Sequence, residues 1–354
     1  MLPAAAAARR SAETVAWADP ARLHHAGRTS GLVLDSARAS IAVFLGVRPS
    51  EVHLTSSSRS ALDFGLAGLL AARPTGALAL SAVESLALFE FADRCDREVE
   101  VLPVDSTGRL RLESVPPEPT WAVACLQAAN PEVGTRQPVE ALATILIPLG
   151  IPLLVDATAC PAHLPLPTGW SALALSARDW GGPAGVGVLV VRQGTSWVRP
   201  AGSDRGWLGG FPDIPSAAAA GIAAETIGPI WESEAKRSFA LIARMREVLA
   251  STIDDLDIVG EPHDRLPHVL TFSALYCSGE AVVTELDRRG FAVASGSACV
   301  SDTERPSHVL AAMGALTGGN VRVSLPFGCT DETVDDFLRQ LPDVIRSVRA
   351  DAGL

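Results

Sequence analysis

Short apolar segments alternate with amphipathic ones along the first two thirds of this 354-residue chain. The apolar runs are typical of buried strands and lie at residues 76–82, 99–104, 121–126, 151–155, 172–175 and 186–191. The segments between them show the 3.6-residue period of helices, as at 60–72 and 139–149. Continuous apolar strands separated by such helices predict an α/β fold with a mostly parallel sheet covered by helices on both faces. Ligands bind such sheets at the carboxyl ends of the strands.

The pattern changes after a Gly-, Pro- and Trp-rich stretch at 194–215, which predicts a long loop. A long helix is expected at 231–251, followed by a smaller α+β unit. Its strands are expected at 269–272, 291–294 and 321–324, and its helices at 279–289, 306–313 and 331–348. We therefore predict a large domain over 1–225 and a small C-terminal domain over 226–354.

Charge and cysteine content exclude several classes of protein. The net charge of -11 opposes binding to a phosphate backbone, so we expect no nucleic-acid partner. No apolar run reaches the roughly 20 residues that a membrane helix needs, so we expect no membrane span. The six cysteines show no CxxC or CxxH spacing, which argues against a disulfide framework or a zinc site and favours a reducing, cytoplasmic location.

Three segments carry side chains suited to chemistry. Cys299 ends the small-residue segment Ser295–Cys299 and is either a reactive thiol or an inert buried one. Asp156 ends an apolar strand and is either a partner for a protonated pyridine nitrogen or a helix N-cap. The Gly-rich stretch at 181–187 allows close backbone approach to a ligand, although a tight turn explains it equally well.

Together these segments resemble the cysteine desulfurases, in the class-V branch of the pyridoxal-phosphate aminotransferase fold. The similarity runs from about Asp19 to the C-terminus. The matching segments are Asp19–His24 with Gly27 and Arg28, Glu132–Pro138, Ser295–Cys299, Pro306–Leu310 and Arg322–Ser324. Their order and spacing agree with the family, which implies a fold-type-I architecture and a homodimer.

The resemblance implies a role for each matching position. In the family, a cysteine attacks the sulfur of the cofactor-bound substrate cysteine and becomes a persulfide; Cys299 matches it. Arg322 matches the arginine that binds the substrate carboxylate, as a bidentate guanidinium suits. Asp156 matches the partner of the pyridine nitrogen, and Ser176 matches a serine that binds the cofactor phosphate.

The lysine that forms the Schiff base in the family has no counterpart here. The family's Ser-x-His-Lys motif is matched by 176–179, which places Asp179 at the lysine position, and a carboxylate forms no imine. The single lysine of the chain, Lys236, lies in the long helix after the predicted boundary. Other positions that contact the cofactor also differ, namely Ser85, Ala159, Phe211 and, in the phosphate loop, Arg59.

Because these substitutions surround one ligand, we expect pyridoxal phosphate to be lost and Asp156 and Ser176 to be vestigial. Arg59 and Arg178 then form a candidate anion site, with Asp179 as its counter-charge. The leading hypothesis is a pseudoenzyme of the family that acts in sulfur transfer, either as a persulfide acceptor or relay through Cys299 or as a dimeric scaffold, with a sulfur donor or acceptor protein as partner. The alternatives are an active desulfurase with atypical cofactor binding and an anion- or small-molecule-binding module.

Overall fold

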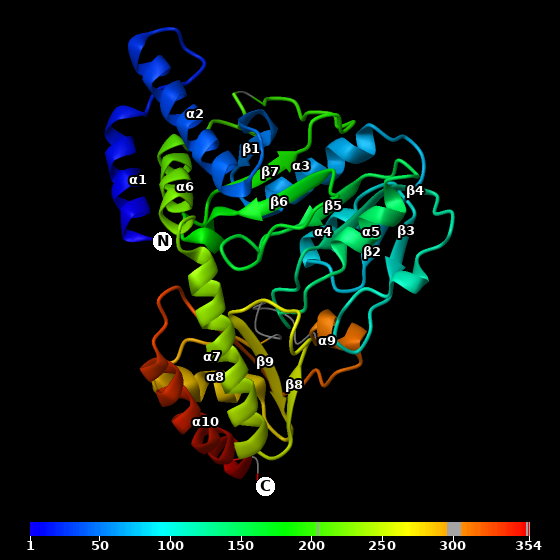
Figure 1. The fold of residues 1–354 in the computed structure, drawn as a ribbon, viewed down its shortest axis with the longest axis vertical. Helices are drawn as coiled ribbons and strands as arrows, with labels where there is room; N and C mark the ends of the chain where they lie inside the picture. Colours follow the sequence, from blue (N-terminus) through cyan, green and yellow to red (C-terminus); the bar gives the residue numbers. More distant parts are fainter. Residues whose placement is uncertain (204, 296–305, 352, 354) are drawn as a thin grey trace. The chain divides into compact units, whose positions relative to one another are not determined.

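The computed structural model describes residues 1–203, 205–295, 306–351 and 353 (Figure 1). The chain divides into two compact units. The first unit comprises residues 1–102, 112–128 and 138–231, and the second comprises 103–111, 129–137 and 232–354. The boundary that we predicted at residue 225 falls inside helix α6 (Ile214–Ile227).

A seven-stranded sheet organises the first unit, in the order β1-β7-β6-β5-β4-β2-β3. Its strands are β1 (Val52–Thr55), β2 (Ala77–Ser81), β3 (Val99–Leu102), β4 (Trp121–Gln127), β5 (Leu153–Asp156), β6 (Ala172–Ser176) and β7 (Gly187–Val191). The strands from β6 to β3 run parallel, whereas β7 is antiparallel to both of its neighbours. The predicted α/β class with a mostly parallel sheet is confirmed.

Helices cover both faces of this sheet. On one face, α3 (Ser58–Ala71) and α4 (Leu86–Ala92) pack on a core that includes Leu154. Side chains alternate along a strand, so Leu153 and Val155 point to the opposite face, where they are also buried. Helix α5 (Val139–Leu146) packs against β5. Burial on both faces explains why these strands are apolar at almost every position.

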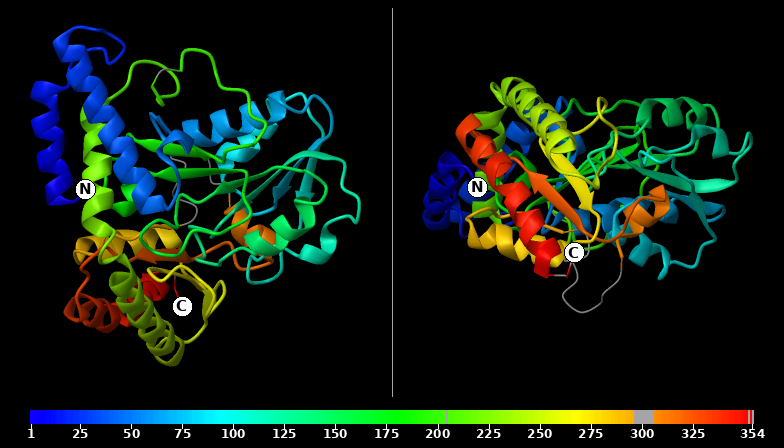
Figure 2. Two further views of the ribbon diagram at one scale, coloured as in Figure 1. Left: turned by 45° about the horizontal axis from the view of Figure 1, so that its top comes forward. Right: turned by 90° about the horizontal axis from the view of Figure 1, so that it is seen from below.

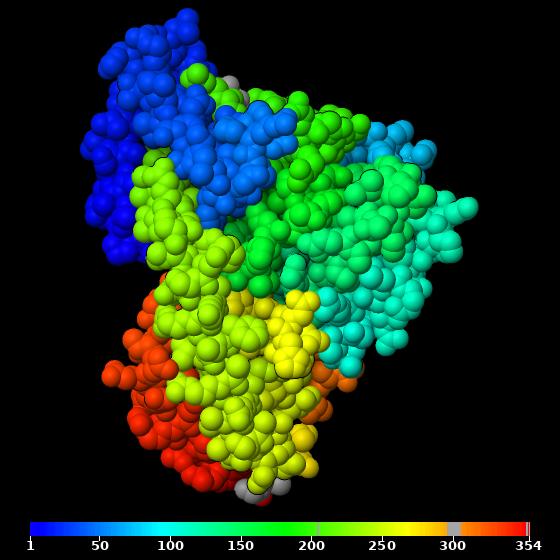
Figure 3. Space-filling view, viewed as in Figure 1, coloured from blue at the N-terminus to red at the C-terminus, as the bar shows by residue number. Residues whose placement is uncertain are grey.

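Helices α1 (Pro3–Val15) and α6 of the first unit were not predicted from the sequence. Helix α6 packs between α1 (Pro3–Val15) and α2 (His25–Leu45), and the space-filling view shows α1 and α6 side by side (Figure 3). Most of α6 is Ala, Gly and Ile, and residues on several of its sides are buried. A helix that is buried on more than one side has no polar face, and therefore shows no amphipathic period.

The second unit contains a three-stranded antiparallel sheet, in the order β10-β9-β8. Its elements are α7 (Trp231–Thr252), β8 (Leu256–Val259), β9 (Val269–Ala274), α8 (Gly279–Arg288), α9 (His308–Met313), β10 (Asn320–Ser324) and α10 (Asp331–Asp351). Helices α7, α8 and α10 form one core with Leu270 and Phe272 of β9, and Figure 2 shows α7 and α10 beside this sheet. The strand predicted at 291–294 is wrong: only a bridge between Ala294 and Arg322 forms there.

Three short 3-10 helices also belong to the first unit: η1 (Pro49–Glu51), η2 (Leu112–Ser114) and η3 (Ala177–Trp180). Among the helices of the described residues, none is long and apolar enough to cross a membrane.

Candidate functional site

The carboxyl ends of three neighbouring parallel strands bring polar side chains to one edge of the large sheet. Gln127 ends β4, Asp156 ends β5 and Ser176 ends β6. Gln127 and Asp156 are direct partners across the β4–β5 ladder. Parallel strands end at the same edge, which is where ligands bind in sheets of this kind. The first unit therefore has a candidate site at this edge.

Asp156 is held by the chain that follows it. The residue is 7% exposed, and its Oδ1 accepts a hydrogen bond of 3.0 Å from the backbone N–H of Thr158. Burial raises the pKa of Asp156, while hydrogen bonds from Thr158 act in the opposite direction. Burial thus favours the neutral acid, and local hydrogen bonding favours the carboxylate.

A second buried carboxyl group, Glu84, lies beside Asp156 and was missed by the sequence analysis. It follows β2, is fully buried, and accepts a hydrogen bond of 2.8 Å from the backbone N–H of Gln127. Burial, and then the negative charge of Asp156, raise the pKa of Glu84 to about 8. The available signal was a carboxylate three residues after an apolar strand, the kind of position that had singled out Asp156.

Asp179 lies at the same edge, in the 3-10 turn that follows β6. Burial raises the pKa of Asp179 to about 6; Arg178 and a hydrogen bond from Ser176 lower it, and the charge of Asp156 raises it. Its side chain is 24% exposed. The structure therefore brings Asp156, Ser176 and Asp179 together, with Asp179 able to exchange a proton near neutral pH.

The two arginines of the candidate anion site each have a carboxylate neighbour. Arg59, in the first turn of α3, pairs with Glu90, and both side chains are about half exposed. Arg178 lies 3.9 Å from Asp179, and its side chain is 73% exposed. A shared anion would compete with these carboxylates for both guanidinium groups. The anion site stays a prediction.

A close backbone approach shapes the turn between β1 and α3. The Thr55 hydroxyl donates to the Ser57 carbonyl at 2.7 Å, and the Ser57 hydroxyl accepts from the N–H of Ser60 to cap α3. A Cβ atom on Gly187 would lie 2.0 Å from the Ser57 carbonyl oxygen. Glycine at 187 therefore lets β7 pass directly against this turn.

Arg322 belongs to the second unit. It lies in β10 opposite Thr271 of β9, on the face of the small sheet away from the Phe272 core. Its Nε is buried and makes no hydrogen bond within the described part of the chain. A buried guanidinium donor of this kind suits an acidic ligand such as a carboxylate. Cys299 lies outside the described residues.

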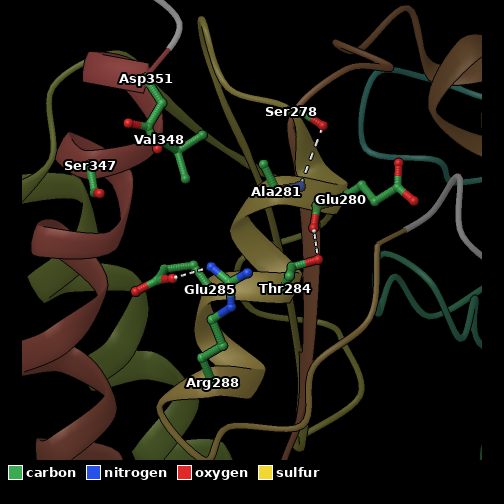
Figure 4. Close-up of a pocket in the computed structure, with 9 residues that line it drawn as sticks. All are labelled: Ser278, Glu280, Ala281, Thr284, Glu285, Arg288, Ser347, Val348 and Asp351. Atoms are coloured by element: carbon green, nitrogen blue, oxygen red, sulfur yellow. Dashed lines mark hydrogen bonds and ion pairs between the residues drawn. The ribbon is translucent and has the colours of Figure 1, made fainter.

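A surface pocket of about 430 Å³ lies between α8 and α10 of the second unit (Figure 4). Glu285 accepts hydrogen bonds from Arg288 and Arg289, and the Thr284 hydroxyl donates to the Glu280 carbonyl within the same helix. The residues that line it include none of the residues predicted from the sequence.

Comparisons with known proteins agree with one another. The aminotransferase class-V family model matches residues 14–337. The chain is 31% identical to the cysteine desulfurase NifS of Azotobacter vinelandii, over 95% of this chain and 88% of that protein. It is 32% identical to a cysteine desulfurase of Cereibacter sphaeroides, over 95% and 91%. A solved NifS-like protein superposes with a TM-score of 0.87 at 25% identity, covering 98% of this chain and 96% of that one.

The expectation that pyridoxal phosphate is lost is wrong. The chain matches, over almost its whole length, a family whose cysteine desulfurases depend on that cofactor, and no loss of cofactor binding is found. The site fits the group in part. Asp156 is buried at the ligand edge and suits the pyridine nitrogen, and Ser176 suits the phosphate. The first unit contains no lysine whose amine could bond to the aldehyde, because the single lysine of the chain, Lys236, belongs to the second unit.

The sequence matches and the superposition point to one conclusion. This chain belongs to the aminotransferase class-V family and is a relative of its cysteine desulfurases.

Proposed function

We propose that this protein acts in sulfur transfer as a persulfide acceptor and relay, with Cys299 as the sulfur-carrying residue. The observation that carries the proposal is the segment Ser295–Cys299, within a chain that aligns with cysteine desulfurases over 95% of its length. In the transfer, the Cys299 thiolate attacks the outer sulfur of a donor persulfide. The donor S–S bond breaks, the donor cysteine leaves as a thiolate, and Cys299 becomes the persulfide.

The relay role is supported by the residue at position 179. A carboxylate there supplies no amine for a covalent bond to pyridoxal phosphate, which favours sulfur arriving from a donor protein. A sulfur donor and an acceptor are then the partners of this protein. We propose a homodimer as its assembly, as the resemblance implies.

A second candidate is a desulfurase that holds pyridoxal phosphate without a covalent bond. It is favoured by the retained Asp156, which is buried at the carboxyl edge of the sheet. When bound, the cofactor supplies an electron sink for cleavage of the substrate. In this candidate Asp156 binds the pyridine nitrogen, Ser176 binds the phosphate, Arg322 orients the substrate carboxylate, and Asp179 moves protons.

The relay is tested by sulfur transfer from an active cysteine desulfurase. The donor, L-cysteine and this protein are incubated together, and persulfides are located by mass spectrometry of alkylated peptides. We expect a persulfide on Cys299 that disappears in Cys299→Ser. Cys277→Ser is the matched control because Cys277 is a partly exposed cysteine of the same unit. Equal labelling of Cys299→Ser and wild type contradicts the proposal.

The second candidate is tested by sulfide release from L-cysteine in the presence of pyridoxal phosphate and without a donor. Borohydride reduction followed by mass spectrometry then reports any covalent attachment. We expect bound cofactor with no added mass at any residue, and added mass at position 179 in Asp179→Lys. Absence of sulfide release leaves the relay as the function, whereas release that requires Asp156 favours the second candidate.

A further inference from the structure

The first unit has a second pocket, of about 510 Å³, at the other edge of the large sheet. Ser176, at the carboxyl end of β6, pairs with Gly187 at the start of β7, whereas Arg192 follows the end of β7. Because β6 and β7 are antiparallel, the pocket lies toward the amino end of β6, away from the candidate site. The segment between α2 and η1 and the residues after β7 line it, namely Gly46, Val47, Arg48, Glu51, Arg192 and Gln193.

Two guanidinium groups line this pocket, and both are held in place by neutral groups. The Arg192 guanidinium lies over the Trp170 ring, with its central carbon 3.9 Å from the ring centroid. Stacking uses the face of the guanidinium group and leaves its in-plane N–H donors for a ligand. Arg48 donates one N–H to Gln193 Oε1. Across the part of the chain that the structure describes, neither arginine forms an ion pair with a carboxylate.

Glu51, the acidic residue of the pocket, is held by the backbone. Its two oxygens accept the N–H of Gln193 at 2.8 Å and the N–H of Arg48 at 3.0 Å, and the residue is 8% exposed. Burial opposes its ionisation, but these hydrogen bonds and the charges of Arg192 and Arg48 outweigh burial and lower the pKa of Glu51. The lining residues therefore carry two positive charges and one negative charge at neutral pH.

We propose that this pocket binds a phosphate group, either as inorganic phosphate or as a small phosphate ester. A phosphate dianion accepts hydrogen bonds on several oxygens at once, so Arg48 and Arg192 can bind it from two separate segments. The amide N–H groups of Gln193 add neutral donors, because its oxygen is used by Arg48.

The size and charge of the pocket favour this class of ligand over a carboxylate. A carboxylate carries one charge and is satisfied by one bidentate guanidinium group, whereas two guanidinium groups match a dianion. The volume of about 510 Å³ falls within the range of about 300–1,000 Å³ that is usual for small-molecule sites, which leaves room for an organic group on the phosphate. The proposal does not depend on the sulfur-transfer function.

Isothermal titration calorimetry with inorganic phosphate, near neutral pH and at low salt, tests the site. We expect Arg48→Gln and Arg192→Gln each to bind at least about tenfold more weakly than wild type, since each removes one charged donor. Arg10→Gln is the matched control, because it removes the same charge from an exposed position of the same unit, and it should bind within about twofold of wild type. Circular dichroism establishes that each variant is folded.

Three results of these titrations would overturn the proposal. They are a wild type that binds no phosphate, binding that both pocket variants retain, and an equal loss in Arg10→Gln. Acetate tests the ligand class: we expect it to bind at least about tenfold more weakly than phosphate, and equal affinities contradict the assignment to phosphate.

The position of the bound anion is tested with tungstate, a heavy analogue of phosphate that anomalous scattering locates in crystals. We expect a tungstate ion between the guanidinium groups of Arg48 and Arg192. Tungstate bound only at the carboxyl edge of the sheet, beside Ser176, refutes the proposal and assigns the phosphate to the candidate cofactor site.

Discussion

Replacing Glu84 by Gln should remove a pH-dependent loss of stability from this protein. Burial and the charge of Asp156 raise the pKa of Glu84 from 4.5 to about 8. Between these values the folded protein keeps a proton that the unfolded chain releases, so the free energy of unfolding of the wild type falls as pH rises from 4.5 to 8. The difference of about 3.5 pKa units corresponds to a loss of at most about 5 kcal/mol, at about 1.4 kcal/mol per unit. Glutamine does not titrate, so the free energy of unfolding of Glu84→Gln does not fall with pH for this reason.

Urea unfolding at a series of pH values from 5 to 9 measures the effect. The free energy of unfolding of Glu84→Gln, relative to wild type, should increase with pH up to about pH 8 and then level off. Glu118→Gln makes the same chemical change at an exposed position and should give a curve parallel to that of the wild type. If the curve of Glu84→Gln also runs parallel to that of the wild type, the raised pKa of Glu84 is wrong.

Three further substitutions test the site. Burial raises the pKa of Asp179 from 3.8 to about 6, so the free energy of unfolding of the wild type should fall by at most about 3 kcal/mol relative to Asp179→Asn as pH rises from about 4 to 6. Melting temperatures of both proteins at pH 4 and 7 check this, and the same difference between them at both pH values would contradict it. Gly187→Ala places a Cβ 2.0 Å from the Ser57 carbonyl oxygen and should cost about 2 kcal/mol in thermal unfolding, whereas Gly185→Ala, with open space around it, should not. Arg59→Ala breaks an exposed ion pair and should change the free energy of urea unfolding by less than about 1 kcal/mol; a larger loss would indicate a structural role for Arg59.

The strands of the large sheet were predictable because strands that are buried on both faces are apolar at almost every position. Residues 121–126 and 186–191 were expected as strands and form β4 and β7. The hydrophobic pattern gave no prediction, or a wrong one, where burial depends on segments that are far apart in the sequence. Helix α6 lacks a polar side because α1 and α2 cover it, and 291–294 was read as a strand although it gains only one bridge to β10.

The residues of the candidate site were likewise only partly predictable from the sequence. Asp156 was found because a carboxylate that ends an apolar strand stands out locally. Glu84 also follows an apolar strand, but it was passed over because nothing in the sequence shows that β2, β4 and β5 end side by side. The expected loss of pyridoxal phosphate was wrong: it was inferred from substitutions along the chain, whereas residues 14–337 match a family whose cysteine desulfurases depend on that cofactor, and no loss of binding is found.

The sequence by itself determined the fold class, the family resemblance and the identity of the single lysine, because apolar periodicity and motif order are properties of the linear chain. Only the tertiary structure decided which carboxyl groups meet at the end of the sheet, how deeply each is buried and which guanidinium groups already have a carboxylate neighbour. Those quantities set the protonation of Glu84, Asp156 and Asp179, since electrostatic energy depends on distance and solvent access, and both arise only when distant segments pack together.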